Sequence, residues 1–490
     1  MTLTERIRAW PRFSVYALAA AAGAAGSLGQ APLSLAPAMM LMMIGGFALF
    51  QLTVTPRQSF ALGWTIGATY FALSLRWIVE PFQIDAATHA WMAPFALVLL
   101  SAGLALIWGT AFWFARRLTS QTWALVLTWP LAEMFRAYAL TGFPWANPAQ
   151  GLLESWAGQA LGLFGPHGLT ILAFAVAWAV TSTRSMAMMG GLAGLVFAAL
   201  LVPVSLPDPT LTGKIVRLVQ PNAPQDEKWD PELAHIFVDR QIEMTAAAGE
   251  FDLVVWSEMS IPYRTSVAAP VFEAAARAAR GAPLLMGAMH DDDAGLFFNA
   301  ALLVGPDGRT SQRYDKHHLV PFGEYMPFPA LFRGLGIRAL AERTETGYTS
   351  GPGARLMDFG DLGLGLPLIC YEVVFPQDLR GTPRADFLVN ITNDAWFGMT
   401  LGPQQHLALS RMRAIEQGLP MIRVGGTGIS AMIDAHGRVQ ASIPLNQAGF
   451  IDAGLPVPLA PTLYSRTGDL PYLVLLLVSL IAATFRRARH

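Results

Sequence analysis

The chain has 490 residues, of which 53% are apolar and only 14% are charged. This composition excludes an ordinary soluble protein and indicates one embedded in a membrane. The formal net charge of −1 provides no basic field for nucleic acid, so charge indicates no polymeric partner. The single cysteine, Cys370, excludes an intramolecular disulfide and a multi-thiolate zinc site.

The N-terminal part of the chain is predicted to form membrane-spanning helices. No charged residue lies between Arg12 and Arg57, and one helix of that length would be roughly twice as long as a bilayer core of ~30 Å. A hairpin of two spans is therefore expected, with its turn in the Gly, Pro and Ser residues of 27–37. The apolar stretches predict eight spans, at 13–29, 35–54, 58–78, 90–115, 119–139, 166–183, 187–205 and 471–485.

The short loops between the spans predict the orientation. Alternate loops contain arginine, whereas those near 30–34, 80–89 and 140–165 contain neither Lys nor Arg. The positive-inside rule then places both termini in the cytoplasm and residues 207–469 on the extracytoplasmic side. Signal-peptide cleavage is the alternative for the first stretch, although its small-residue site is poor and a second span follows at once.

Three domains are therefore predicted. Residues 1–206 form a seven-span bundle, and residues 470–490 form the eighth span and a cytoplasmic tail. Residues 207–469 alternate short β-rich runs with helical stretches near 230–248, 267–280 and 402–417, which is typical of a layered α/β domain. The turns PDG at 306–308 and AHG at 435–437 suggest hairpins, so the sheet is expected to be mixed.

Three segments that end or follow predicted strands carry reactive groups. They are DLVVWSEMS with Glu258, QRYDKHHLVPFGEYMP with Lys316 and Glu324, and LGLPLICYEVVFP with Cys370. A cysteine nucleophile needs a base, and acyl transfer needs a cation or N–H donors where negative charge develops on the carbonyl oxygen. A carboxylate, an ammonium and a thiol meet these needs.

Each of these residues also has a structural interpretation. A lone cysteine after an apolar strand is commonly a buried inert thiol, but Tyr371 and Glu372 follow this one directly, and they are poor core residues. Glu258 and Lys316 could be solvated, although lysine is rare here, with only three in the chain. The adjacent His317 and His318 could suggest a metal, but no second ligand cluster has suitable spacing. No metal or cofactor is predicted.

Four motifs together carry a family resemblance. WSEMS, YDKHHLVPFGEYMP, ICYEVVFP and NDAWFG follow one another in the order and approximate spacing of the carbon–nitrogen hydrolase (nitrilase) superfamily. PFGEYMP and ICYE, with seven spans before the domain and one after it, resemble the bacterial apolipoprotein N-acyltransferase family. The turn at 425–428, Gly-Gly-Thr-Gly, departs from the Asn-rich turn more usual in that family, which puts contacts there in doubt.

The resemblance implies a fold and a set of roles. The fold is a four-layer αββα sandwich next to an eight-helix bundle in the bacterial inner membrane. Glu258 resembles the general base, Lys316 the cation that stabilises the oxyanion, and Cys370 the acylated nucleophile. The backbone N–H of Tyr371 would complete the oxyanion hole. Further positions that match residues needed by the family are Trp229, Glu324, Tyr371 and Glu372.

The resemblance also implies the substrates. The donor is the sn-1 acyl chain of a phospholipid, typically phosphatidylethanolamine, and the acceptor is the α-amino group of diacylglyceryl-cysteine on an apolipoprotein. A lipid donor explains why such a domain has membrane spans. The apolar run 325–335 would suit a loop dipping into the outer leaflet, or alternatively packing inside the domain.

Two charged residues are expected inside one span. Glu133 and Arg136 lie three residues apart on a predicted helix, where an isolated charge would be costly. An ion pair that supports the TGFPW loop at 141–145 is expected in preference to a catalytic role.

Two other functions stay open at this point. One is a membrane-anchored amidase that hydrolyses a small amide, since hydrolysis and transfer share the thioester and differ in the nucleophile that reaches it. The other is a transporter with a degenerate nitrilase-like domain. The few charges predicted within the spans argue against a transporter, because solute pathways usually contain several.

Overall fold

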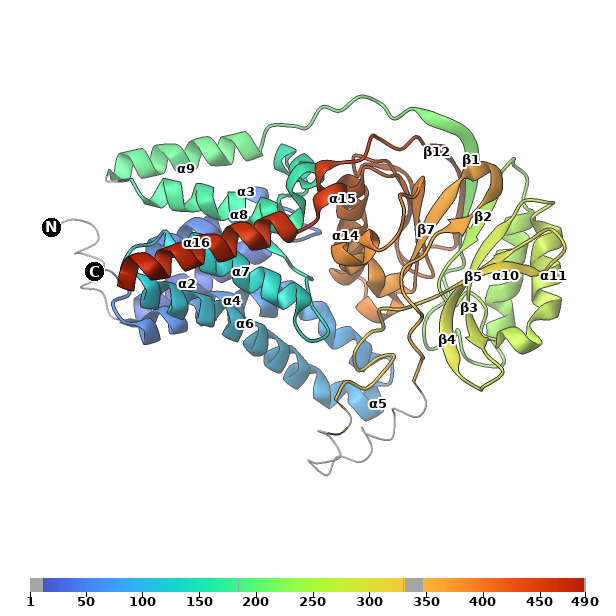
Figure 1. Cartoon of the computed structure of the whole chain (residues 1–490). Coiled ribbons are helices and arrows are strands. Elements are labelled where there is room, and N and C mark those ends of the chain that lie inside the picture. The colour runs from blue at the N-terminus through green and yellow to red at the C-terminus, as the bar shows by residue number, and fades with distance from the viewer. Residues whose placement is uncertain (1–11, 184, 329, 331–346, 489–490) are drawn as a thin grey trace. The chain divides into compact units, whose positions relative to one another are not determined.

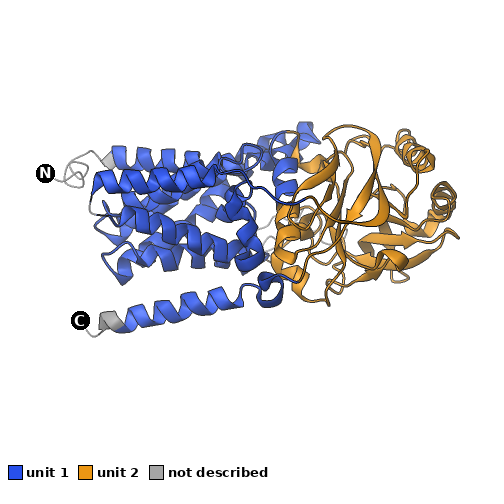
Figure 2. Cartoon of the chain, turned by 90° about the horizontal axis from the view of Figure 1, so that it is seen from above, with its two compact units in different colours: residues 1–207, 400–408, 461–490 blue, residues 208–399, 409–460 orange. Residues whose placement is uncertain are grey.

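A computed structural model describes residues 12–488 apart from residues 184, 329 and 331–346. The chain forms two compact units, which are coloured separately in Figure 2. Unit 1 comprises residues 1–207, 400–408 and 461–490, and unit 2 comprises residues 208–399 and 409–460. These limits differ from the predicted domains because residues 400–408 and 461–469 belong to the unit that contains the apolar helices.

Unit 1 is helical, and a helix lies on each of the eight predicted apolar stretches (Figure 1). The bounds of these helices are α2 Arg12–Ser27, α3 Ala36–Phe50, α4 Pro56–Ser74, α6 Ala93–Leu118, α7 Ala124–Tyr138, α8 Leu161–Thr181, α9 Met186–Leu200 and α16 Leu470–Ala488. Short helices connect or precede them, at η1 Arg76–Gln83, α5 Ala86–His89, η2 Ala90–Met92, η3 Pro148–Leu152, η4 Trp156–Ala160 and α15 Leu463–Thr467.

Two helical stretches of the described chain, Ala86–Leu118 and Trp156–Thr181, are long and apolar enough to cross a membrane. Four further apolar helices are shorter, and they cover Phe13–Ser27, Ala36–Phe50, Met186–Leu200 and Leu470–Phe485. Apolar side chains that would be costly to expose to water lie on the surfaces of α6 and α16, including Leu99 and Phe485. Eight membrane crossings remain a prediction.

The charge pair expected inside a span is present. An Arg136 guanidinium nitrogen lies 2.6 Å from a Glu133 carboxylate oxygen, and both side chains are buried. Arg136 also donates to the carbonyl oxygens of Phe143 and Trp145, while the indole N–H of Trp108 donates to Glu133 at 2.6 Å. The prediction that this pair supports the loop at 141–145 is confirmed, because Arg136 donates to two carbonyl oxygens of that loop. Each charge of the pair is also paired and hydrogen-bonded in the low-dielectric interior.

Unit 2 contains two six-stranded mixed sheets. The first has the order β12-β1-β2-β3-β4-β5, and its strands are β12 Gly449–Pro456, β1 Leu211–Gln220, β2 Leu253–Trp256, β3 Leu284–Asp291, β4 Phe297–Val304 and β5 Thr310–Asp315. The second has the order β11-β10-β9-β8-β7-β6, and its strands are β11 Val439–Ile443, β10 Ser430–Ile433, β9 Met421–Gly425, β8 Phe387–Thr392, β7 Leu364–Ile369 and β6 Met357–Asp358.

The sheets and helices of unit 2 form layers. Apolar residues of both sheets, such as Val255 and Val389, share one buried core. The outer face of the first sheet packs on α10 Ala234–Ala246 and α11 Ala269–Ala278 through a second core (Figure 1). On the second sheet, the amide oxygen of Asn390 accepts from Ser410 of α14 Gly402–Gln417. The expected αββα sandwich is therefore present.

Most elements of unit 2 were predictable from the sequence pattern. Both expected hairpins are found, since β4 pairs antiparallel with β5 and β10 with β11. The predicted helices correspond to α10, α11 and α14. Strands β6 and β12 were not anticipated, because each has a partly exposed pattern without a sustained apolar run.

The apolar run 325–335 is described only in part. Met326 is buried and Phe328 is about half exposed, at 54%. The remaining apolar positions of this run, Leu331, Phe332 and Leu335, lie outside the described residues. The outer-leaflet loop therefore remains a prediction.

One glutamine attaches the segment 400–408 to the rest of unit 1. The amide of Gln405 donates to the carbonyl oxygens of Ala31 and Ser74 and accepts from the indole N–H of Trp145 at 2.8 Å. Its own carbonyl oxygen accepts from Gln150. Because Gln405 is fully buried, these bonds fix the first turns of α14 within unit 1.

Candidate active site

The proposed base, Glu258, lies just past the end of β2. Its carboxylate accepts from the side-chain amide of Asn299 at 2.7 Å and from the backbone N–H of Asn393 at 2.7 Å. The following residue, Met259, has a φ of 47°, a left-handed conformation that is costly for a residue with a side chain. The sharp turn after β2 thus directs a buried carboxylate into the site, where hydrogen bonds fix its position.

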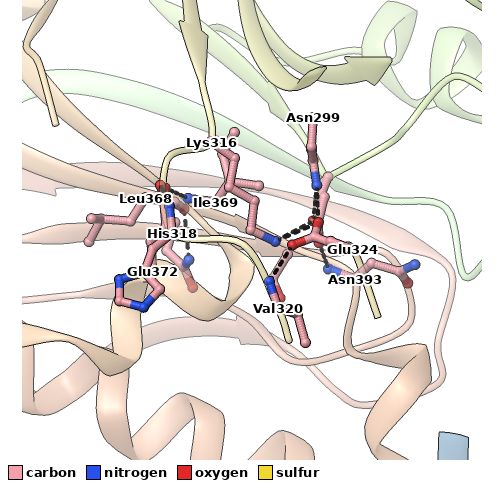
Figure 3. A network of polar contacts seen from close by, with 12 residues as sticks. Asn299, Lys316, His318, Val320, Glu324, Leu368, Ile369, Glu372 and Asn393 are labelled. Carbon is pink, nitrogen blue, oxygen red and sulfur yellow. Dashed lines mark hydrogen bonds and ion pairs between the residues drawn. The ribbon is translucent and has the colours of Figure 1, made fainter. Parts of the chain in front are cut away.

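The proposed cation, Lys316, directly follows β5 and is 1% exposed. Its ammonium nitrogen lies 2.9 Å from a Glu324 carboxylate oxygen and 3.5 Å from one of Glu258. The other oxygen of Glu324 accepts from the backbone N–H of Val320 at 2.8 Å. Figure 3 shows Lys316, Asn299 and Val320 converging on Glu324. The structure therefore brings together three residues that the sequence places in two separate segments.

Lys316 remains a cation in this environment. Burial by itself lowers the pKa of the Lys316 ammonium, but the charges of Glu324 and Glu258 outweigh burial and raise its pKa above the ordinary value. A fixed positive charge in a water-poor site can stabilise an oxyanion that develops nearby.

Cys370 forms the corner between β7 and a short 3-10 helix, η8 Cys370–Val374. Its φ of 50° is left-handed, so Cys370 occupies a strained strand-to-helix turn. Arg413 of α14 donates to the carbonyl oxygen of Val374 at 3.1 Å and so secures this turn from the other side. The corner is a rigid place for a reactive thiol.

The Cys370 thiol is protonated at rest. Burial, and then the negative charge of Glu258, raise the pKa of the thiol, while Lys316 lowers it. Since only the thiolate is a strong nucleophile, a thiol in this environment would need a neighbouring base to remove its proton before it could attack a carbonyl carbon. Of the carboxylates that raise the pKa of the thiol, Glu258 has a larger effect than Asp394.

Glu372 ties the segment after β5 to the turn that carries Cys370. The carboxylate of Glu372 accepts from the backbone N–H of Ile369 at 2.7 Å and from that of His317 at 2.8 Å. The Tyr314 hydroxyl donates to it at 3.0 Å. The expectation that residues after Cys370 do not suit a core is wrong, because Tyr371 is 5% exposed and Glu372 is fully buried, with its charge satisfied by these donors.

The two histidines contact carboxylates. The Nδ1 atom of His317 lies 2.7 Å from Glu372, and that of His318 lies 2.7 Å from Asp378. Burial by itself lowers the pKa of His317, but Asp378 and Glu372 outweigh burial and raise it to about 10. His317 is therefore a cation at neutral pH and forms part of the supporting network.

Trp229 is 39% exposed, whereas its neighbour Lys228 is buried. The Lys228 ammonium donates to the backbone carbonyl oxygen of Glu258 at 3.1 Å. Burial lowers the pKa of Lys228 to about 8, against an opposing effect of the Glu258 charge. The turn that holds Trp229 is thus attached to Glu258 through Lys228.

The unusual glycine turn at 425–428 lies beside the same residues. A Cβ atom on Gly426 would have Ser257 Oγ at 3.5 Å and Asn393 Oδ1 at 3.6 Å as its nearest neighbours. Within the described chain, neither of these buried oxygens has a hydrogen-bond partner. Gly426 itself has no side chain that could donate to either oxygen.

Asn299, Asn393 and Lys228 were not predicted as site residues. Asn299 begins a predicted strand. The signal that could have marked it as a site residue is its polar side chain between Phe298 and Ala300 in a buried strand. Asn393 is the first residue of the NDAWFG motif, and Lys228 is one of only three lysines. The contacts of all three arise from distant segments, which a single sequence does not reveal.

Comparison with known proteins places both parts of the chain. The carbon-nitrogen hydrolase family matches residues 215–460, and the apolipoprotein N-acyltransferase N-terminal domain matches residues 22–179. The apolipoprotein N-acyltransferase of Caulobacter vibrioides is 38% identical over an alignment that covers 96% of this chain and 95% of the relative. The one from Rhodopseudomonas palustris is 33% identical, with the same coverage of both chains.

Among solved structures, the chain is similar to a carbon-nitrogen hydrolase superfamily protein from Xanthomonas campestris. The alignment covers 49% of this chain and 90% of that protein's chain. It is 20% identical, with a TM-score of 0.38.

Proposed function

Because the chain belongs to the apolipoprotein N-acyltransferase family, we propose that Cys370 carries an acyl group from a phospholipid to an apolipoprotein amine. Glu258 is the general base, and Lys316 is the oxyanion cation. The observation that supports this most is that buried Glu258 and Lys316, which lie next to each other and beside Glu324, both act electrostatically on Cys370.

The first half-reaction acylates the cysteine. Glu258 takes the thiol proton while sulfur attacks the sn-1 ester carbonyl carbon, and the developing oxyanion lies near Lys316 and the backbone N–H of Tyr371. The carbon–oxygen bond to the glycerol then breaks. The departing lyso-lipid oxygen takes the proton from Glu258, and a thioester remains on Cys370.

The second half-reaction transfers the acyl group. The α-amino nitrogen of diacylglyceryl-cysteine attacks the thioester carbonyl carbon, and Glu258 accepts the proton that the nitrogen loses. The carbon–sulfur bond breaks, and the sulfur regains a proton from Glu258 as the amide forms. One carboxylate therefore serves both halves of a ping-pong scheme.

The proposed setting is the bacterial inner membrane. Both termini are proposed to lie in the cytoplasm and residues 207–469 on the periplasmic side, and the alternating arginine-containing loops support this orientation. Phosphatidylethanolamine is the proposed acyl donor. Four further residues support the triad. Glu324, Tyr371 and Glu372 do so through the contacts around Glu258 and Cys370, and Trp229 does so from its place beside Lys228.

The covalent scheme is tested by separating the halves. Wild-type enzyme in detergent is mixed with phospholipid labelled in its sn-1 chain, and intact mass spectrometry follows the protein. We expect one acyl adduct on Cys370 that hydroxylamine removes, and its transfer once a diacylglyceryl-cysteine peptide is added. Label transfer by Cys370→Ser, or no adduct before the peptide is added, would show the scheme to be wrong.

A further inference from the structure

Asn299 occupies the centre of the carboxylate cluster. Its side-chain nitrogen donates to Glu258 Oε1 at 2.7 Å and to Glu324 Oε1 at 2.9 Å. Lys316 contacts the same two oxygen atoms. One neutral amide and one ammonium thus bridge the same pair of carboxylate oxygens.

Asn299 also positions the cation through its backbone. Its carbonyl oxygen accepts from the backbone N–H of Lys316 at 2.8 Å, so a single residue of β4 contacts both charges and their partner. Asn299 is 2% exposed, and its strand is paired with β3 at Met289. The sheet therefore fixes the position of the amide.

The orientation of the amide follows from its neighbours. Rotating the Asn299 amide by half a turn would point its oxygen at two carboxylate oxygens, where the electrostatic interaction is repulsive. In the observed orientation Oδ1 is buried and has no hydrogen-bond partner within the described part of the chain. Burying an acceptor without a hydrogen-bond partner lowers the stability of the fold. The orientation that directs both N–H donors at the carboxylates therefore carries a stability penalty.

Two buried carboxylates that share donors tend to share a proton, because their negative charges repel each other. A shared proton would disable the base. Lys316 supplies only one positive charge for the two, and the other titratable neighbours are Cys370, Lys228 and Tyr348. The two side-chain N–H donors of Asn299 are neutral. They stabilise the charged form of both carboxylates and do not add a group that could transfer a proton to them.

We propose that Asn299 is a positioning residue that aims two neutral N–H donors at Glu258 and Glu324 and keeps both carboxylates charged and in place. This inference rests on the proposed function, since Glu258 must be the base whose protonation matters.

The test is the pH dependence of Cys370 acylation by labelled phospholipid, in the wild type, Asn299→Leu and Asn299→Asp. Leucine removes both donors, so the acidic limb of the profile should move to higher pH by about one unit. Aspartate has nearly the shape of asparagine but adds a third carboxylate. Its limb should move further, with a loss of about 100-fold at pH 7.

Two controls make the outcomes distinct. Gln312→Leu removes an amide from β5 that bonds to the backbone of Asp358, and it should keep the wild-type profile. Glu258→Gln tests the base itself: normal acylation by this variant would overturn the proposed function whatever Asn299 does. An inactive Glu258→Gln combined with unshifted profiles for the Asn299 variants would overturn only the role of Asn299.

A merely structural role gives a different result. If Asn299 only fills space, Asn299→Leu, which introduces no charge, should acylate with the wild-type profile, which would contradict the proposal. Should Asn299→Leu fail to fold, judged by thermal unfolding in detergent, Asn299→Ala removes the same two donors without adding a charge and takes its place.

Discussion

At the residue scale, the backbone that carries Glu258 packs directly on a glycine of β3. A Cβ atom on Gly287 would lie 2.6 Å from the Cα of Glu258 and 2.5 Å from the backbone nitrogen of Met259. These atoms belong to a strained turn and cannot rotate away. A Cβ on Gly426 would make only ordinary van der Waals contacts.

These two glycines form a matched pair for mutation. We expect Gly287→Ala to displace the base and lower Cys370 acylation by ~10-fold or more, since small misplacements of catalytic groups are costly. Gly426→Ala should keep its rate within about two-fold, because an added methyl has room. Equal rates for the two variants in the labelled-phospholipid assay would contradict the packing argument.

The catalytic charges themselves should not tolerate conservative change. Glu258→Gln keeps the shape but cannot accept a proton. Lys316→Arg keeps the charge but places a larger planar group between Glu258 and Glu324. Each should lower Cys370 acylation by at least ~100-fold while the protein still folds. A near-normal rate in either variant would remove that residue from the proposed mechanism.

At the element scale, the segment after β5 and the 3-10 helix η8 are joined by Glu372 and stabilised by a charged histidine. Since the folded pKa of His317 is about 10 and its ordinary value is 6.5, this histidine contributes stability that is fully present below pH 6.5. That contribution is lost as the pH rises through about 10.

The difference in melting temperature between the wild type and His317→Asn isolates this contribution. We expect the wild type to melt a few degrees higher at pH 6, and the difference to shrink steadily until it disappears above about pH 10. Other titrating groups are common to both proteins and cancel. A difference that stays constant from pH 6 to pH 10.5, measured by thermal unfolding in detergent, would show that His317 is not held charged.

The elements that could be predicted from the sequence are those whose pattern is local. Alternating or continuous apolar runs marked β1, β2 and β7, and helical periodicity marked α14 at its observed bounds, Gly402–Gln417. Strand β12 was not predicted because its partner, β1, lies more than 200 residues earlier in the chain. Pairing with a buried strand, rather than its own composition, makes it a strand.

Only the site residues that belong to recognisable motifs could be predicted from the sequence. Glu258, Lys316 and Cys370 stand out as reactive types at strand ends. Asn299 does not stand out, because its meaning depends on two carboxylates that are 41 and 25 residues away along the chain. The burial of Glu372 was missed for the same reason, because donors to its carboxylate come from another segment.

At the scale of the whole molecule, the proposed topology makes a direct prediction. A reporter fused after Pro207 should behave as periplasmic, and one fused after His490 as cytoplasmic, because arginines concentrate in alternate short loops. Alkaline phosphatase and green fluorescent protein fusions read these two sides. The opposite pair of results would overturn the orientation.

The whole chain contains one thiol, and that thiol is protonated and 5% exposed. Oxidants and alkylating reagents react with the thiolate, so the environment that raises the pKa of Cys370 also protects it from peroxide and from mixed disulfides. No second cysteine exists to form an internal disulfide with a sulfenic acid. An enzyme that works in an oxidising compartment would then keep its nucleophile reduced without a dedicated reductase.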